Sequence, residues 1–184
     1  METDPDHELV EGWRKGDRKA FAALVERYQR PVYNAAFRVL GNADDAADTA
    51  QAVFLKVAQH LDEYDPRYRF FSWLYRIAVN ESLNLLRRNG REEPLDEAVE
   101  LPGEASANPE WQVGEAQVAR QVQSALMRMK ADDRVVLTLR HFSELSYQEI
   151  AQVLGLDEKT VKSRLFEARG RLRGLLGGLK TEGT

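Results

Sequence analysis

Apolar side chains recur with the 3.6-residue period of an α-helix along most of the 184-residue chain, and no segment shows the alternation of a half-buried β-strand. Asp17 can cap the first long stripe, which passes Pro31 and ends at Gly41. Further helices are predicted over about 43–61, 71–88, 113–129 and 131–142. The pattern therefore predicts an all-α fold.

A helix-turn-helix pattern lies between residues 146 and 172. Ser146 and Glu149 have the spacing of a capping box, Gly155 can end the short helix that they begin, and Asp157 can cap a second helix. On that helix, Val161 begins an apolar stripe at i, i+4, i+7 and i+11, which would dock it onto its neighbours. Its other faces would read a DNA groove and contact phosphates, and the candidate residues are Lys159, Thr160, Lys162, Ser163, Arg164, Phe166, Glu167, Arg169 and Arg171.

Charge is divided into blocks, although the net charge is only −4. Residues 67–91 contain six arginines and one glutamate, and residues 158–180 contain seven basic and two acidic residues. Residues 92–116 contain eight acidic residues and no basic one. Binding to nucleic acid depends on local potential rather than on the sum of charges, so the two basic blocks predict two nucleic-acid contacts.

The acidic block coincides with prolines, glycines and a loss of helical periodicity, which is the composition of a flexible linker. We therefore expect two small helical domains, residues 1–90 and 112–184, joined by an acidic linker at 91–111. An ordinary solvated linker, extended by repulsion between its carboxylates, accounts for the acidic residues as well as a functional role of the linker would.

Aromatic and basic residues are interleaved just before this linker, over residues 64–76. Aromatic rings usually belong to a core, but helical geometry gives the segment a polar, basic and aromatic face opposite an apolar face that includes Leu74 and Ala78. Such a face suits single-stranded DNA, because bases stack on rings and phosphates meet arginines. The candidates are Tyr64, Arg67, Tyr68, Arg69, Trp73, Arg76, Asn80, Asn84 and Arg87.

Several function classes find no support in the sequence. There are no cysteines, no apolar run near the ~20 residues of a membrane span, and no signal peptide in the acidic segment 1–8. The three histidines are dispersed and there is no glycine-rich phosphate loop. We therefore expect a cytoplasmic protein that is not an enzyme, with no metal, no cofactor and no membrane insertion.

The segments Asp45-Ala-Ala-Asp-Thr-Ala-Gln-Ala-Val-Phe-Leu-Lys56 and Phe71-Ser-Trp-Leu-Tyr-Arg-Ile-Ala-Val-Asn80, followed by the helix-turn-helix, resemble an alternative bacterial sigma factor of the extracytoplasmic-function type. The resemblance covers about residues 6–176 apart from the linker. It implies a region 2 domain and a region 4 domain that direct RNA polymerase core to promoters. The helix from Trp73 to Arg87 would open the minus-ten element, the loop 64–69 would hold a flipped base, and the recognition helix would read the minus-thirty-five element.

The resemblance also implies that the helix over 43–61 grips the polymerase core, through Asp45, Asp48, Gln51, Leu55 and Lys56. Ala47 and Ala52 stand where relatives commonly have glutamates, which should weaken attraction to a basic partner. Thr49 lies in this patch, which has fewer acidic residues than the family pattern, and a phosphate on Thr49 would restore negative charge. An ordinary helical threonine is the plainer interpretation. Glu167 also departs from the family pattern, and it could accept a hydrogen bond from a cytosine or turn to solvent.

An anti-sigma protein is a further partner that the resemblance implies. The rival function is a transcriptional regulator with a helical N-terminal sensor domain and the same helix-turn-helix. That rival explains the C-terminal half of the chain equally well, but it gives no reason for the arginine and aromatic face before the linker.

Overall fold

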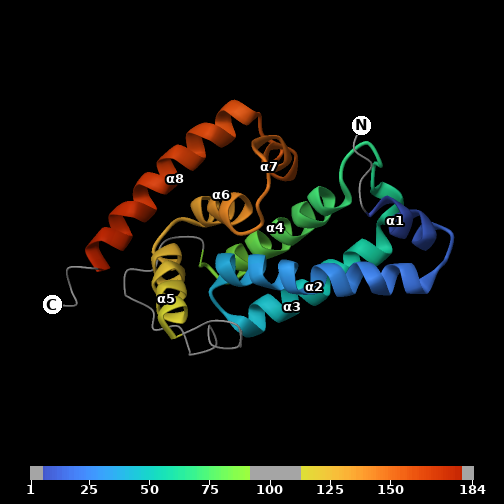
Figure 1. Cartoon of the computed structure of the whole chain (residues 1–184), viewed down its shortest axis with the longest axis horizontal. Coiled ribbons are helices and arrows are strands. Elements are labelled where there is room, and N and C mark those ends of the chain that lie inside the picture. The colour runs from blue at the N-terminus through green and yellow to red at the C-terminus, as the bar shows by residue number, and fades with distance from the viewer. Residues whose placement is uncertain (1–5, 92–112, 180–184) are drawn as a thin grey trace.

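Three long helices, α2, α3 and α4, pack together and form the first half of the molecule, and four further helices cover one side of it (Figure 1). The computed structural model describes residues 6–91 and 113–179. The helices of these two ranges are α1 (His7–Arg14), α2 (Arg18–Leu40), α3 (Ala43–Gln59), the short 3₁₀ helix η1 (Leu61–Glu63), α4 (Phe70–Arg88), α5 (Val113–Met127), α6 (Ala131–His141), α7 (Tyr147–Leu154) and α8 (Glu158–Leu179).

Local capping sets where the first helices begin and end. The Asp17 carboxylate accepts a hydrogen bond of 2.8 Å from the Lys19 amide, which satisfies a free N–H in the first turn of α2. Gly41 ends α2 in the left-handed conformation at φ 71°, and the Asn42 side chain then accepts from the Asp45 amide to begin α3. Pro31 lies inside α2 without ending it.

The core of the first half lies between α1, α2, α3 and α4. Leu24, Val53, Phe70 and Leu74 are each at most 1% exposed there, and Val10 of α1 belongs to the same cluster. The apolar faces of α2, α3 and α4 therefore pack against one another in this core, as helical periodicity predicts.

A second core joins the two halves of the chain. Tyr75, Val79 and Leu86 of α4 and Ala36 of α2 are buried in one cluster with apolar residues of α5, α6, α7 and α8. The apolar stripe of α8 contributes Val161, Leu165 and Ala168, all fully buried. The second half therefore docks directly on α2 and α4 through an apolar surface.

Polar and cationic contacts supplement this apolar interface. The Gln123 side-chain amide donates to the carbonyls of Phe37 and Arg38, at 3.1 and 3.3 Å. The Arg38 guanidinium lies 3.5 Å from the centre of the Phe142 ring, and burial lowers the pKa of Arg38 to about 10. The interface thus encloses charge as well as hydrocarbon.

The predicted all-α fold is confirmed over the described residues, and the helices predicted over about 43–61, 71–88, 113–129 and 131–142 end within two residues of those observed. Two features differ. Helix α1 was not predicted, and the 43–61 helix ends at Gln59, after which η1 turns the chain toward α4. Residues 92–111 of the predicted linker lie outside the described residues. None of the helices in the described ranges is long and apolar enough to cross a bilayer.

Gly41 provides a test of the interface between the halves. A Cβ at Gly41 would meet the Sδ of Met127 from α5, whereas a Cβ at Gly90, also in the left-handed region at φ 63°, would meet nothing. We predict that Gly41→Ala and Gly90→Ala both lose about 1–2 kcal/mol from backbone strain, and that Gly41→Ala loses more because Met127 must move. Urea unfolding of the two variants measures the difference, and equal losses would contradict the steric contact.

Candidate nucleic-acid interface

Helix α4 presents one polar face to solvent. Arg76, Asn80, Asn84 and Arg87 are exposed along it, and the Arg87 guanidinium donates to the Asn84 side-chain oxygen at 2.8 Å. The opposite face is buried, as the sequence predicted. Four of the predicted contacts on this helix therefore lie on one accessible strip.

Trp73 was expected on the same strip, but its side chain is half-buried. Its ring lies 5.5 Å from the ring of Tyr64 and 5.9 Å from that of Phe70, between ring centres. Such a cluster is held by apolar burial and by ring geometry. Trp73 therefore supports the end of α4 and offers only part of its ring to a ligand.

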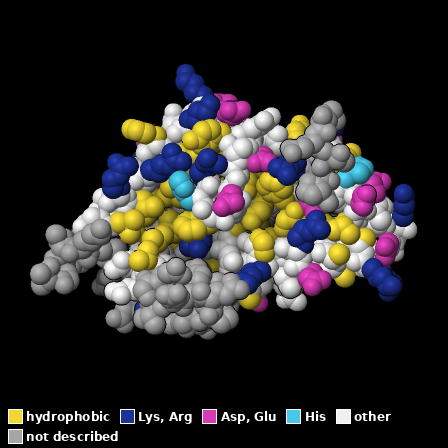
Figure 2. Space-filling view, viewed as in Figure 1, with side chains coloured by type: hydrophobic (Ala, Val, Ile, Leu, Met, Phe, Trp, Pro, Cys, Tyr) yellow, Lys and Arg dark blue, Asp and Glu magenta, His cyan; other side chains and the backbone are white. Residues whose placement is uncertain are grey.

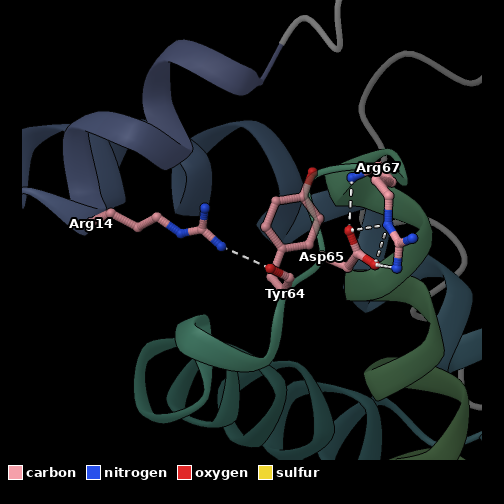
Figure 3. Close-up of polar contacts among 4 residues, drawn as sticks. All are labelled: Arg14, Tyr64, Asp65 and Arg67. Atoms are coloured by element: carbon pink, nitrogen blue, oxygen red, sulfur yellow. Dashed lines mark hydrogen bonds and ion pairs between the residues drawn. The ribbon is translucent and has the colours of Figure 1, made fainter.

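The loop 64–69 precedes this end of α4, and the structure divides its residues into two roles (Figure 3). Tyr64 is only 4% exposed, and its hydroxyl donates to the Tyr68 carbonyl at 2.7 Å. The ring of Tyr64 is therefore not available to stack on a base, contrary to the sequence-based expectation. Arg67, Tyr68 and Arg69 are exposed.

Two side chains of the loop are already paired with carboxylates. Arg67 donates to the Asp65 carboxylate at 2.6–3.1 Å, and these hydrogen bonds lower the pKa of Asp65. Arg69 pairs at 3.0 Å with Glu149 of α7, eighty residues along the chain. The described conformation therefore joins a candidate single-strand contact to the helix-turn-helix.

The helix-turn-helix forms as its sequence predicts. Ser146 and Glu149 make both hydrogen bonds of a capping box, and Gly155 ends α7 in the left-handed conformation at φ 65°. The Asp157 carboxylate accepts from the amide of Thr160 at 2.8 Å and from its hydroxyl at 2.7 Å, which lowers the pKa of Asp157. Thr160 therefore belongs to the cap of α8, and its hydroxyl is occupied.

The N-terminal half of α8 presents the accessible candidates. Lys159, Lys162, Ser163 and Phe166 are exposed, and the Phe166 side chain is 79% exposed although it is aromatic. Basic side chains gather along α8, whereas the end of the molecule near α1 carries both signs (Figure 2). An apolar ring among cations on the second helix of this motif can meet a thymine methyl group while the cations meet phosphates.

The C-terminal half of α8 uses its charges within the protein. Arg171 pairs with Asp133 of α6 at 2.8 Å and with Glu167 at 3.0 Å, so the Glu167 carboxylate has a basic partner on its own helix. The Arg169 Nε donates to the Nε2 of His141 at 3.0 Å. Burial and the nearby charges of Arg169 and Arg140 lower the pKa of His141, which favours the neutral ring that can accept this bond. Arg169 and Arg171, two of the predicted DNA contacts, therefore hold α8 against α6, and Glu167 pairs with Arg171 on α8 itself.

Arg164 faces a different surface from the reading face. With Arg87 of α4, Arg128 and Lys130 it lines a cleft of about 970 Å³ between α4, α6 and α8. The sequence placed Arg164 and Arg87 in separate sites, but the structure brings them to one cleft.

The candidate partner surface on α3 adjoins an apolar groove of about 670 Å³ between α2 and α3. Gln51 and Leu55 line it, with Phe21, Tyr33 and Phe54, and the Leu55 side chain is 57% exposed. A large exposed leucine beside a groove indicates a contact surface more strongly than a scattered one does.

The remaining candidates on α3 differ in accessibility. Asp48 is exposed, whereas Lys56 pairs with Glu81 at 2.6 Å and Asp45 pairs with Arg91 at 2.5 Å. Thr49 faces the core and is 5% exposed, so a kinase cannot reach its hydroxyl while α3 is packed in this way. Its position three residues after Ala46 on the buried stripe is the sequence signal that could have shown this.

Sequence reasoning also missed Arg14, which lies on α1 and donates to the Tyr64 carbonyl at 2.7 Å (Figure 3). The apolar residues Leu9, Val10 and Trp13 could have predicted the helix. No sequence pattern could have predicted a contact between residues fifty positions apart.

Comparisons with known proteins identify the family of the chain. The model of Sigma-70 region 2 matches residues 24–92, and that of Sigma-70, region 4 matches residues 119–172. The chain is 34% identical over 175 residues to the RNA polymerase sigma-H factor of Pseudomonas aeruginosa, with 90% of this chain and 91% of that protein covered. It is 36% identical over 173 residues to the ECF RNA polymerase sigma-E factor of Escherichia coli, with 89% and 90% covered.

Two solved structures are similar over nearly their whole length. CnrH in complex with the cytosolic domain of CnrY has a TM-score of 0.73 and 28% identity, with 94% of this chain and 97% of that chain covered. The sigma factor RpoE in complex with the anti-sigma factor NepR from Bartonella quintana has a TM-score of 0.70 and 25% identity, with 86% and 98% covered. Together with both region models, these matches show that the chain belongs to the ECF RNA polymerase sigma factors of the sigma-70 family.

Proposed function

We propose that this protein is an alternative sigma factor that directs bacterial RNA polymerase core to specific promoters and begins DNA melting there. The observation that carries the proposal is the presence, on one chain, of two different exposed surfaces whose side chains suit DNA. One is the polar strip of α4 with its adjoining loop, and the other is the exposed N-terminal half of α8. A regulator with a sensor domain would need only the second surface.

The α8 surface suits duplex DNA. Lys159 and Lys162 can meet phosphates on either side of a major groove, while Ser163 and Phe166 reach base edges. The recognition helix of a helix-turn-helix docks in this way. We assign this surface to the minus-thirty-five element.

The α4 surface suits unpaired DNA. Asn80 and Asn84 can hydrogen-bond to base edges that are accessible only after strand separation, and Arg76 can meet the backbone. Tyr68, which is 47% exposed, is the ring of the loop that can stack on an extruded base. We assign this surface to the minus-ten element.

The groove between α2 and α3 is the proposed site for the polymerase core. Leu55 and Gln51 would contact a helical segment of the core, and Asp48 would pair with its basic residues. Ala47, which lines the groove, leaves that contact less acidic than the usual family pattern. We therefore expect apolar burial rather than ion pairing to supply most of the affinity.

We propose that the chain divides into a region 2 domain at 1–90, a linker at 91–111 and a region 4 domain at 112–184. The ranges of the two region models support this division. Promoter elements centred near −10 and −35 are separated by roughly 25 base pairs, about 85 Å of duplex at 3.4 Å per base pair. The contacts of α6 and α7 with α4 must therefore open before both surfaces can bind one promoter.

Other aspects of the proposal concern chemistry and partners. The sigma factor itself performs no catalysis and binds no cofactor, because the polymerase supplies the phosphoryl transfer and its magnesium ions. It acts in the cytoplasm.

CnrH and RpoE are each solved with a second protein, CnrY and the anti-sigma factor NepR, which supports an anti-sigma partner for this chain.

The division of labour between the two surfaces is testable with purified core polymerase and a promoter mapped after overexpression. Asn80→Ala should lower permanganate-detected strand opening about tenfold, whereas Phe166→Ala should weaken binding to the duplex upstream element about tenfold. Asn34→Ala, at an exposed asparagine of α2, is the matched control and should change neither. If both variants lost opening and duplex binding equally, the assignment of surfaces would be wrong.

The polymerase surface is tested by a pair of exposed apolar residues. Leu55 is 57% exposed on α3 and Val118 is 59% exposed on α5. Leu55→Asn should raise the Kd for core polymerase about tenfold because it removes a central apolar contact, whereas Val118→Asn should change it less than twofold. Titration of labelled protein with core polymerase measures both Kd values. A larger effect of the Val118 substitution would contradict the assignment of the polymerase contact to the groove between α2 and α3.

The Arg69–Glu149 pair is tested without loss of the capping box, because glutamine at position 149 can still accept the helix cap. Glu149→Gln should favour the separated arrangement by up to about fivefold, since an exposed ion pair contributes about 0.2–1 kcal/mol. The sequence has no cysteine, so two introduced cysteines at the exposed positions Lys19 and Arg173 give a single pair of labels. Unchanged energy transfer between them would show that the pair does not hold the halves together.

A further inference from the structure

The loop 64–69 has an unusual support, because its backbone is held by a residue of another helix. Arg14, at the end of α1, donates from Nη2 to the Tyr64 carbonyl at 2.7 Å, and its guanidinium lies 5.6 Å from the centre of the Tyr64 ring (Figure 3). The Tyr64 hydroxyl in turn donates to the Tyr68 carbonyl at 2.7 Å. Arg14 and Tyr64 together therefore hold both ends of the loop.

Arg14 is committed to this internal role. Its Nη1 donates to Glu11 one turn earlier on α1 at 3.0 Å, so both terminal nitrogens of the guanidinium have an acceptor within the protein, although the residue as a whole is exposed. The fork of donors of an arginine suits two acceptors in different directions, which a point charge does not. Glu11 therefore orients the guanidinium, and the guanidinium orients the loop.

The consequence for the loop is a fixed presentation of its outer residues. With the Tyr64 and Tyr68 carbonyls held, the Tyr68 amide bonds to the Asp65 carbonyl at 3.1 Å and the Arg67 amide bonds to the Asp65 side chain at 3.0 Å. Tyr68 and Arg67 then point outward beside the start of α4. A pocket for a single base gains affinity when its loop is ordered before binding, because less conformational entropy is lost.

We propose that Arg14 is a positioning residue for base capture: it holds the loop 64–69 in the shape that receives an unpaired promoter base, without contacting the DNA. This proposal rests on the proposed function. Arg14 lies before residue 24, where the match to the region 2 model begins, so that model assigns it no role. Helix α1 is thereby part of the promoter-opening machinery.

The test uses the full chain with core polymerase at its mapped promoter. Arg14→Met keeps an apolar stem but removes all donors, and it should lower permanganate-detected opening about tenfold while duplex binding by α8 is unchanged. Arg14→Lys retains one donor for the Tyr64 carbonyl and should restore at least half of the opening. Lys15→Met, which removes the same charge at the next and exposed residue, should have no effect.

A second variant separates positioning from a direct contact with phosphate. Tyr64→Phe leaves the Arg14 charge in place but removes the bond to the Tyr68 carbonyl, so it should reproduce the Arg14→Met defect. If Arg14 acted on the DNA by its charge, Tyr64→Phe would open the promoter normally, and the proposal would be overturned.

Hydrogen exchange of the free protein tests the structural step by itself. Arg14→Met should accelerate exchange of the Arg67 and Tyr68 amides about tenfold, while the core amides of Val32 and Val53 keep their rates. Unchanged loop exchange, or faster exchange with normal promoter opening, would overturn the proposal. Failure of the unaltered protein to open any promoter with core polymerase would instead reject the proposed function.

Discussion

The burial of α4 on two sides at once is the constraint on which the rest of the structure depends. One side packs against α2 and α3 through Phe70 and Leu74, and the other packs against α6 and α7 through Tyr75 and Val79. Only a narrow strip of the helix then remains in solvent. That strip holds the polar side chains of Arg76, Asn80 and Asn84, because the other faces of α4 are buried. These side chains are therefore accessible to DNA.

The interface between α4 and the second half of the chain is apolar, but it also encloses cationic side chains that favour its opening. Its apolar cluster is supplemented by Arg38 and Arg134, and burial lowers the pKa of each to about 10. Arg134 donates to the Met127 sulfur and the Arg91 carbonyl, which are weaker partners than a carboxylate. Burying a cation in this way costs free energy that opening would recover. A sigma factor that must span two promoter elements has use for such an interface.

The two proposed DNA-binding surfaces are built on different physical principles. The α8 surface is carried by a rigid motif whose caps, Ser146 and Asp157, and turn residue, Gly155, are all local in sequence. The α4 surface depends on a loop whose shape is set from outside, by Arg14. Duplex DNA presents a regular groove to a preformed helix, whereas an extruded base needs a pocket assembled from several segments. Promoter opening is therefore expected to be more sensitive to distant substitutions than upstream recognition is.

Sequence alone determined the features that arise from neighbouring residues. The all-α fold, the capping box, the turn at Gly155 and the two faces of α4 follow from 3.6-residue periodicity and from hydrogen bonds within a few positions. The exposure of Lys162 and Phe166 opposite a buried Val161 follows in the same way.

Tertiary structure alone decided which of the candidate side chains are free to act. Nothing in the sequence separates Tyr64, Arg69 and Arg171 from the other candidate DNA contacts. In the structure each of them forms a hydrogen bond with a protein residue between 4 and 80 positions away. Thr49 became inaccessible because α3 has helices on its inner side. Such outcomes depend on how the helices meet, and contacts between distant segments leave no periodic signal in a single sequence.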